Sequence, residues 1–367
     1  MNLAVDVQAR ENVPPWLVYG TPVFTVIAAL AVSAVALVAL EVSPIEAYSV
    51  MFVETVTDPF GIAETLKKAV PLVLTGLAVY LPLKAGLWNI GAEGQLILGG
   101  IAGTWVGLNV SLPWFALLPL MFLGASLAAA FWAAVPAWLR AKWDINEIIT
   151  TLLLTFVALN LKNYLIRGPM QGGTGTFPQT ARLPEAARIP ELFSTGVHAG
   201  VLVALVMVGV TWVLLQKTRL GYEITFVGSN HEAATQAGMS KYKVYLLVFV
   251  LGGAFAGMAG ISEIAGIQGR FRAGFEPGYG FTAIVIALLG RNGALKVLLA
   301  GLFFALITVG GTSMEVALGI PAALTEVIQA LIILFLITAE FFKNYRVSVG
   351  LERDTSSTPA SATGGDA

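Results

Sequence analysis

Long apolar stretches separated by short polar segments dominate the chain. Ten of these stretches are long enough, or nearly so, to cross roughly 30 Å of hydrocarbon as helices. They cover residues 21–40, 69–83, 90–108, 114–139, 145–161, 198–215, 244–261, 281–289, 295–312 and 324–342. The stretch at 281–289 is short for a full crossing, so we expect it to extend into its flanks or to form a half-helix. The pattern predicts an all-α, polytopic membrane protein with about ten transmembrane helices.

The composition supports a membrane protein and excludes several other classes. Of 367 residues, 57% are hydrophobic and 12% are charged, against about 25% charged residues in an ordinary soluble domain. The net charge of −1 provides no basic surface for nucleic acid. The chain contains no cysteine and two histidines, His198 and His231, which lack metal-ligand spacing. We therefore expect no metal site and no cofactor bound by this chain.

Lysine and arginine positions predict the orientation, because short cytoplasmic loops are enriched in both. With the N-terminus inside, thirteen basic residues fall on the inner side and eight on the outer side. Both termini are therefore expected in the cytoplasm. Residues 1–20 form an N-terminal segment, since the first apolar stretch is longer than a signal-peptide core. Residues 21–345 form the membrane domain, and 346–367 are expected to be a disordered tail.

Residues 86–95 place a carboxylate and two amides among glycines in an otherwise apolar region. A charged side chain near the middle of a membrane helix costs on the order of 3 kcal/mol, so Glu93 should face protein, water or a solute. The glycines predict a broken helix near 86–95, which is tolerated where backbone is buried in protein or lines a cavity. The candidate solute-path residues are Trp88, Asn89, Glu93 and Gln95, which bring amides, a carboxylate and an aromatic ring to this segment.

Other polar residues have simpler interpretations that remain open. Glu93 could equally be a strut that joins helix ends across the break. Asn160 and Asn163 are weaker path candidates, because the end of their helix could be wet. At the inner face Asn146 and Glu147 begin a helix, where a carboxylate complements the helix dipole. Small faces for close helix packing are supplied by Gly252, Gly253, Gly257 and Gly260.

Two polar segments are too long for simple turns. The outer one, 164–197, contains a glycine-rich run without the lysine of a P-loop, so we expect an ordered outer loop. In the inner one, 217–243, Asn230 can cap a short helix that Gly238 ends. Such a helix, fixed between two membrane helices, is suited to receive force from a soluble motor, although it could be a connector without a partner. The chain has no P-loop motif, so ATP would have to be used elsewhere.

Three motifs resemble the permease subunits of ABC importers for simple sugars and nucleosides. They are Asn-Ile-Gly-Ala-Glu-Gly-Gln at 89–95, Asn-Glu-Ile-Ile-Thr-Thr at 146–151, and Val-Gly-Ser-Asn at 227–230 followed by Ala-Gly at 237–238. The resemblance covers about 43–345 and is closest to the branch that works with basic-membrane-protein-type nucleoside-binding lipoproteins. In that family a cytosolic coupling helix docks into the ATPase. It maps here to 226–238, with Gly228, Asn230, Glu232, Ala233, Ala234 and Gly238.

The resemblance implies a non-catalytic subunit of a bacterial inner-membrane importer. Its expected partners are an ATPase subunit, a substrate-binding lipoprotein and a second permease, either a shorter paralogue or a second copy. Trp88 stands where the family has phenylalanine, and residues 291–294 lack the proline often found there, so the substrate stays open. The alternative is an ion-gradient-driven secondary transporter, which would also have broken helices and an intramembrane carboxylate but would give no role to 226–238.

Overall fold

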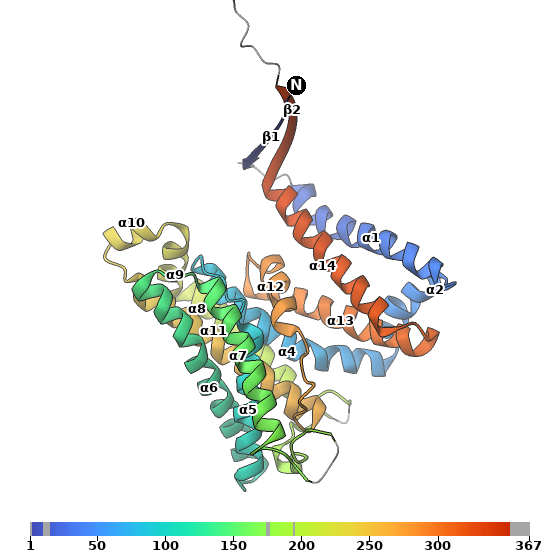
Figure 1. The fold of residues 1–367 in the computed structure, drawn as a ribbon, viewed down its shortest axis with the longest axis vertical. Coiled ribbons are helices and arrows are strands. Elements are labelled where there is room, and N and C mark those ends of the chain that lie inside the picture. Colours follow the sequence, from blue (N-terminus) through green and yellow to red (C-terminus); the bar gives the residue numbers. More distant parts are fainter. Residues whose placement is uncertain (1, 10–14, 174–176, 194, 353–367) are drawn as a thin grey trace, which may run out of the picture. The chain divides into compact units, whose positions relative to one another are not determined.

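The computed structural model is predominantly helical and describes residues 2–9, 15–173, 177–193 and 195–352 (Figure 1). The chain divides into two compact units. One is Leu37–Gln329, and the other combines Met1–Ala36 with Ala330–Ala367.

The helices follow the apolar stretches along the chain. In order they are α1 Pro15–Ala39, α2 Pro44–Tyr48, the π-helix η1 Ser49–Glu54, α3 Thr55–Thr57, α4 Pro59–Lys84, α5 Ala92–Asn109, α6 Trp114–Trp143, α7 Glu147–Arg167, the 3-10 turn η2 Glu185–Ala187, α8 Gly200–Lys217, α9 Arg219–Ser229, α10 His231–Gln236, α11 Lys241–Glu263, the π-helix η3 Ile264–Gln268, α12 Tyr279–Leu289, α13 Ala294–Leu318 and α14 Ala322–Asn344.

Each of the ten predicted stretches coincides with one helix, but fewer qualify as membrane spans. Within the described residues, seven helices are long and apolar enough to cross a membrane: α4, α6, α7, α8, α11 with η3, α13 and the 322–339 part of α14. The described apolar part of α1 and the 11 residues of α12 are shorter. At 1.5 Å per residue α12 is about 16 Å long, which matches the predicted half-helix. Ten crossings remain a prediction.

Helix α11 lies at the centre of the larger unit and packs against α4, α5 and α6. About two thirds of its apolar window is buried (67%), against 22% for α7, so α11 is a core helix and α7 a peripheral one. Backbones touch at Gly257, where a Cβ would overlap the carbonyl oxygen of Ala125, and a Cβ on Gly99 would overlap the Gly257 backbone. The predicted small-residue packing of α11 is confirmed.

The predicted broken helix is a connection of irregular backbone between two helices. The N–H groups of Ala85 and Gly86 donate to the carbonyls of Pro82 and Leu83 at 2.9 and 3.1 Å, which closes the end of α4. Gly86 then takes a φ of +77°, a conformation that favours glycine. Helix α5 begins at Ala92. The irregular backbone therefore covers residues 85–91, and Glu93 and Gln95 lie in the first turn of α5.

One pair of strands corrects the all-α expectation. Strands β1 (Asn2–Ala9) and β2 (Tyr345–Glu352) pair antiparallel, with Val5 opposite Val349 and Val7 opposite Val347. In both segments the sequence alternates apolar and polar residues, the period typical of a strand. The prediction of a disordered tail is thus wrong for 346–352, while 353–367 lie outside the described residues.

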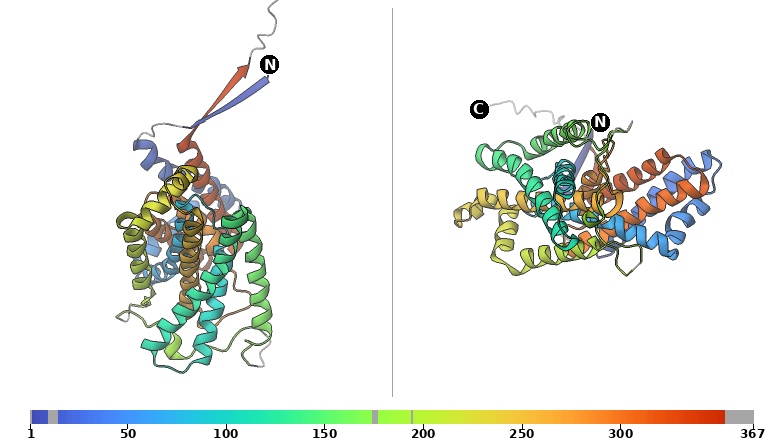
Figure 2. Two further views of the ribbon diagram at one scale, coloured as in Figure 1. Left: turned by 90° about the vertical axis from the view of Figure 1, so that its left-hand side faces the viewer. Right: turned by 90° about the horizontal axis from the view of Figure 1, so that it is seen from below.

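The two ends of the helical core carry different structures (Figures 1 and 2). Helices α9 and α10 lie at one end, beside the ends of α8 and α11. The loops that follow α7 and η3 lie at the opposite end. The connection formed by α9 and α10 is thus separated from these loops by the length of the core helices.

Candidate functional site

A cavity of about 770 Å³ opens among α4, η3, α13 and the loops that follow α7 and η3. This volume lies within the range of small-molecule sites, roughly 300–1,000 Å³. The side chains that give it its chemistry are Lys68, Phe177, Glu263, Gln268, Arg272, Phe275, Glu276 and Tyr279. None of them was predicted as a path residue from the sequence.

A buried carboxylate organises the polar wall of the cavity. Glu263 is 1% exposed, and its Oε1 accepts hydrogen bonds from Lys68 Nζ at 2.9 Å and Gln268 Nε2 at 3.0 Å. The Tyr279 hydroxyl donates to Glu263 Oε2 at 3.3 Å and accepts from Lys68 Nζ at 3.0 Å. The buried charge is therefore paired, as burial requires. An ammonium has three donors and an amide both donors and acceptors, so Lys68 and Gln268 retain capacity to bind a solute.

The cavity is electrically balanced and has aromatic faces. Two of its lining side chains are cationic, Lys68 and Arg272, and two are anionic, Glu263 and Glu276. Phe177 and Phe275 add ring surfaces on which a flat or puckered ring can pack. This combination suits a neutral, hydroxyl-rich solute better than an ion.

One wall of the cavity is residues 269–280, which we call the cavity strap. It is paired with the outer loop: the N–H of Thr180 donates to the carbonyl of Phe271 at 2.9 Å, and that of Ala273 to the carbonyl of Pro178 at 3.0 Å. The described part of the predicted outer loop is thus ordered. Residues 174–176 of its glycine-rich run lie outside the described residues.

Glu93 binds the backbone of the cavity strap at the start of α12. The N–H groups of Gly280 and Gly278 donate to its two carboxylate oxygens at 2.6 and 3.1 Å, and the side chain is 2% exposed. Helix α12 begins at Tyr279 after Gly278, which has no capping side chain, so its first amides lack partners of their own. Glu93 supplies that cap from α5, and its carboxylate complements the N-terminal dipole of α12.

The missing side chain of Gly280 permits this arrangement, since a Cβ there would overlap the backbone N of Glu93. Two helix N-termini, those of α5 and α12, therefore meet at one carboxylate. Glu93 therefore joins the start of α5 to the start of α12 rather than the two sides of the α4–α5 break: it binds backbone amides next to Tyr279, a residue of the cavity wall.

Asn89 and Gln95 bind each other rather than line the cavity. Each side-chain amide donates to the other's carbonyl oxygen at 2.9 Å, and both residues are at most 1% exposed. Asn89 Nδ2 also donates to the backbone carbonyl of Ala78 at 3.3 Å. That carbonyl would otherwise bond to residue 82 of the helix, but Pro82 has no N–H. The amide pair therefore braces the connection between α4 and α5.

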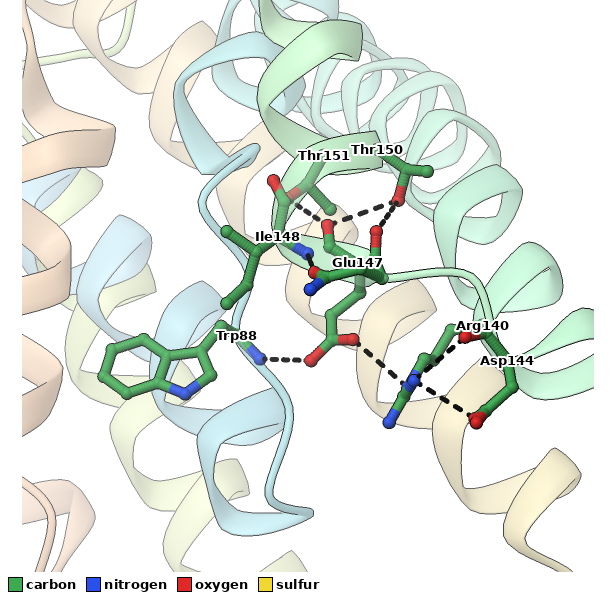
Figure 3. A network of polar contacts seen from close by, with 8 residues as sticks. Trp88, Arg140, Asp144, Glu147, Ile148, Thr150 and Thr151 are labelled. Carbon is green, nitrogen blue, oxygen red and sulfur yellow. Dashed lines mark hydrogen bonds and ion pairs between the residues drawn. The ribbon is translucent and has the colours of Figure 1, made fainter.

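Trp88 lies beside a polar network at the start of α7 (Figure 3). Its backbone N–H donates to Glu147 Oε1 at 3.4 Å, while the indole points away from the network. The other carboxylate oxygen of Glu147 forms an ion pair with Arg140 Nε at 3.1 Å. Asn146 caps α7, accepting from the Ile148 N–H at 2.9 Å, so the helix start predicted at Asn146 and Glu147 is confirmed.

Helix α10 has the predicted form. Asn230 Oδ1 accepts from the Ala233 N–H at 2.9 Å, and Gly238 has a φ of +79° just beyond the helix. Ala234 is the buried face at 1% exposed, while Glu232 is exposed. We call α9 and α10 the coupling region. The sequence interpretation missed α9, which Thr218 caps and on which Tyr222, 60% exposed, stacks against Phe226.

Gly228 connects the coupling region with the connection between α4 and α5. A Cβ on Gly228 would overlap the carbonyl oxygen of Lys84, the last residue of α4. The end of α9 thus rests directly on the backbone at which α4 stops.

A signal for the missed residues was present in the sequence. Lys68, Lys162 and Glu263 are charged residues at the margins of predicted apolar stretches, at 69–83, 145–161 and 244–261. The structure places all three inside helices α4, α7 and α11. The cost of charge in an apolar region, which indicated Glu93, would have indicated these residues too if the stretches had been drawn longer.

Comparisons with known proteins identify the family. Residues 61–337 match the family described as branched-chain amino acid transport system / permease component. The glucose ABC transporter permease protein TsgB13 of Haloferax volcanii is 66% identical over 378 aligned positions, covering 100% of both chains. The guanosine ABC transporter permease protein NupP of Bacillus subtilis is 32% identical, over 86% of this chain and 91% of its own.

A second Bacillus subtilis guanosine permease, NupQ, is 29% identical over 65% of this chain and 78% of its own. No solved structure matches the chain. The family confirms the resemblance drawn from the three motifs and removes the secondary transporter as an alternative. The chain belongs to the branched-chain amino acid transport system / permease component family, and its relatives are ABC permeases for sugars and nucleosides.

Proposed function

We propose that this chain is the permease subunit of an ABC importer and forms the path for a nucleoside or simple sugar. The observation that carries the proposal is the balanced cavity, in which hydrogen-bonding groups of Lys68 and Gln268 lie beside the ring of Phe275. A sugar or nucleoside combines hydroxyls with a ring, the features that such a wall recognises. The names of the relatives, glucose and guanosine permeases, agree with this class.

The proposed orientation places the coupling region in the cytoplasm and the cavity on the outer side of a plasma membrane. Two of the eight basic residues counted as outer, Lys68 and Lys162, are paired inside the protein. Without these two lysines, six of the eight outer basic residues remain, against thirteen on the inner side. The pairing of β1 with β2 also supports an even number of crossings, because it joins the two ends of the chain. A binding protein would deliver the solute at the cavity.

The coupling region is the proposed docking surface of a separate ATPase subunit. A polar hollow of about 270 Å³ lies there between α9 and the turn into α11, lined by Arg219, Tyr222, Glu223 and Lys243. Its exposed aromatic and charged residues suit a protein contact. Gly228 would pass movement from this surface to the α4–α5 connection.

A second permease is the remaining partner. Both NupP and NupQ are guanosine permeases of one organism, and both resemble this chain. We propose a heterodimer with a shorter paralogue, because the 252 aligned residues are 78% of NupQ, which makes NupQ about 320 residues long (252/0.78) against 367 here. In this proposal ATP is used by the partner ATPase, and the chain is a non-catalytic transport subunit.

Uptake measurements test the solute path. Cells that express the chain with its co-encoded partners are given radiolabelled guanosine and glucose. Lys68→Met should lower uptake of the transported probe at least tenfold, because it leaves Glu263 buried without its counter-charge. Lys67→Met is the matched control: Lys67 is the next residue, pairs with Glu64 and does not line the cavity. Uptake of neither probe by the native chain would reject the proposed substrate class.

Affinity purification tests the ATPase partner. The tagged native chain should recover an ATPase subunit from detergent-solubilised membranes. Tyr222→Ala combined with Glu232→Arg should lose it, since both residues are exposed in the coupling region. Tyr164→Ala, which removes an equally exposed aromatic residue at the far end of α7, is the control. Equal recovery of the ATPase with both variants would place its docking site elsewhere.

A further inference from the structure

The buried side chains of Lys162 and Glu93, which carry opposite charges, bind two parts of the cavity strap. We propose that Lys162 and Glu93 are positioning residues that fix the strap, and with it Phe275 and Tyr279, in the shape that selects the solute. The proposal rests on the proposed function for the identity of the solute, but not for the mechanics of the strap.

Lys162 holds the first part. Its side chain is 0% exposed, although it belongs to α7, a largely peripheral helix. Lys162 Nζ donates to the carbonyl of Phe275 at 2.9 Å and to Glu276 Oε1 at 3.1 Å. Glu276 itself is half-exposed at the cavity. Burying an ammonium is costly unless its N–H groups have acceptors. The acceptors on the strap replace the water that Lys162 loses on burial, so Lys162 stays bound to the strap.

Glu93 holds the second part. Its carboxylate binds the N–H groups of Gly278 and Gly280, on either side of Tyr279. The strap therefore has Phe275 and Glu276 bound to a cation and residues 278–280 bound to an anion. The backbone around these bonds is irregular, and Gly278 has a φ of +68°. Before α12 this wall has no helix or strand, so its shape depends on these two side chains together with its backbone bonds to the outer loop and the bonds of the Tyr279 hydroxyl.

Glu93 and Lys162 belong to two helices that pack together. Helices α5 and α7 pack against each other, and a Cβ on Gly94 would lie 2.8 Å from the Cα of Thr155, so their backbones are in close contact. Lys162 lies two turns beyond Thr155 along α7, roughly 10 Å at 1.5 Å per residue. The helices that carry Glu93 and Lys162 are thus packed together, and the strap that both residues bind lines the same cavity as Lys68 and Glu263.

The alternative is that both charges only stabilise the fold. A purely structural role would lower the yield or melting temperature of variants without changing the local opening of the strap or its affinity for solute. Glu93→Gln and Lys162→Met separate the two cases. The first replaces an acceptor with an amide that can accept only one of the two N–H groups, and the second removes both bonds of the ammonium.

Thiol labelling measures the strap directly, because the native chain has no cysteine. Ala273→Cys introduces a reporter on the strap where the native side chain is 6% exposed. In the full transporter, a water-soluble maleimide should label it slowly in the native background and at least tenfold faster with Glu93→Gln or Lys162→Met. Lys162→Arg should restore slow labelling in part. Arg167→Met, which removes an exposed basic residue of the same helix, should leave the rate within twofold.

Solute protection measures the selective role. Thr308→Cys places a thiol on the α13 wall of the cavity, away from the strap. Guanosine or glucose should slow its labelling, and the concentration that halves the rate should rise at least fivefold with Glu93→Gln or Lys162→Met. Unchanged Ala273→Cys labelling and unchanged protection would overturn the positioning role. Faster Ala273→Cys labelling without protection by either probe in the native background would support the strap mechanism and reject the proposed substrate class.

Discussion

At the scale of single residues, buried polar side chains of the described core bind backbone groups that lack a helical hydrogen-bond partner. Pro82 leaves the carbonyl of Ala78 without its helical partner, and Asn89 supplies a donor. Gly278 leaves the first amides of α12 uncapped, and Glu93 supplies the acceptor. Amides and carboxylates that suggest solute binding in the sequence are thus used, in these two places, to satisfy the protein itself.

Asn89→Ala should therefore destabilise the protein. It leaves the Gln95 amide and the Ala78 carbonyl buried without partners, at a cost of about 1–3 kcal/mol. Thermal unfolding of the detergent-solubilised chain, followed by tryptophan fluorescence, should show a lower midpoint. Asn160→Ala is the control, because the exposed Asn160 amide bonds only to its own helix, at the Phe156 carbonyl. An unchanged midpoint for Asn89→Ala would show that the amide pair does not brace the connection.

At the scale of elements, the connection between α4 and α5, together with the helix ends on either side of it, is in contact with three other parts of the larger unit. Gly228 of α9 lies on the carbonyl of Lys84, Glu147 of α7 accepts from the Trp88 N–H, and Glu93 binds the start of α12. The connection thus links the coupling region with the cavity strap. Along α4, Lys84 and Lys68 are 16 residues apart, about 24 Å.

Gly228→Ala tests this link. The added Cβ would overlap the Lys84 carbonyl and force the end of α9 away from the connection. The docking residues Tyr222 and Glu232 are unaltered and stay exposed on the coupling region, so the ATPase should still co-purify and hydrolyse ATP, while solute uptake falls at least tenfold. Gly209→Ala in α8 is the control, because nothing lies within 4 Å of its Cβ position. Normal uptake by Gly228→Ala would remove Gly228 from the coupling route.

At the scale of the whole molecule, the sequence predicts the helices well and the cavity poorly. Apolar length located the ten helices that contain the predicted stretches, and Asn230 and Gly238 located α10, because these signals are local, whereas α9 was missed. The cavity depends on pairs such as Lys68 with Glu263 and Lys68 with Tyr279, which are 195 and 211 residues apart. No local pattern encodes such pairings. The strands were missed because the apolar stretches next to them dominated the interpretation of both termini.

The pairing of β1 and β2 predicts that both chain ends lie on the same side of the membrane. A green fluorescent protein fused to either terminus should fluoresce in intact cells, and alkaline phosphatase fused to either terminus should be inactive, because both ends are expected in the cytoplasm. A phosphatase inserted after Phe193, 93% exposed in the outer loop, should be active. Opposite reporter signals at the two termini would mean an odd number of crossings.

The meeting of two helix N-termini at Glu93 restricts how the core can move. If α12 slid along its axis, Gly278 and Gly280 would lose their shared acceptor, and the carboxylate would be left buried without partners. If α12 tilted about the same point, both bonds would survive. We therefore expect that, when the cavity opens and closes, α12 rotates about its contact with Glu93 rather than sliding along its axis relative to α5.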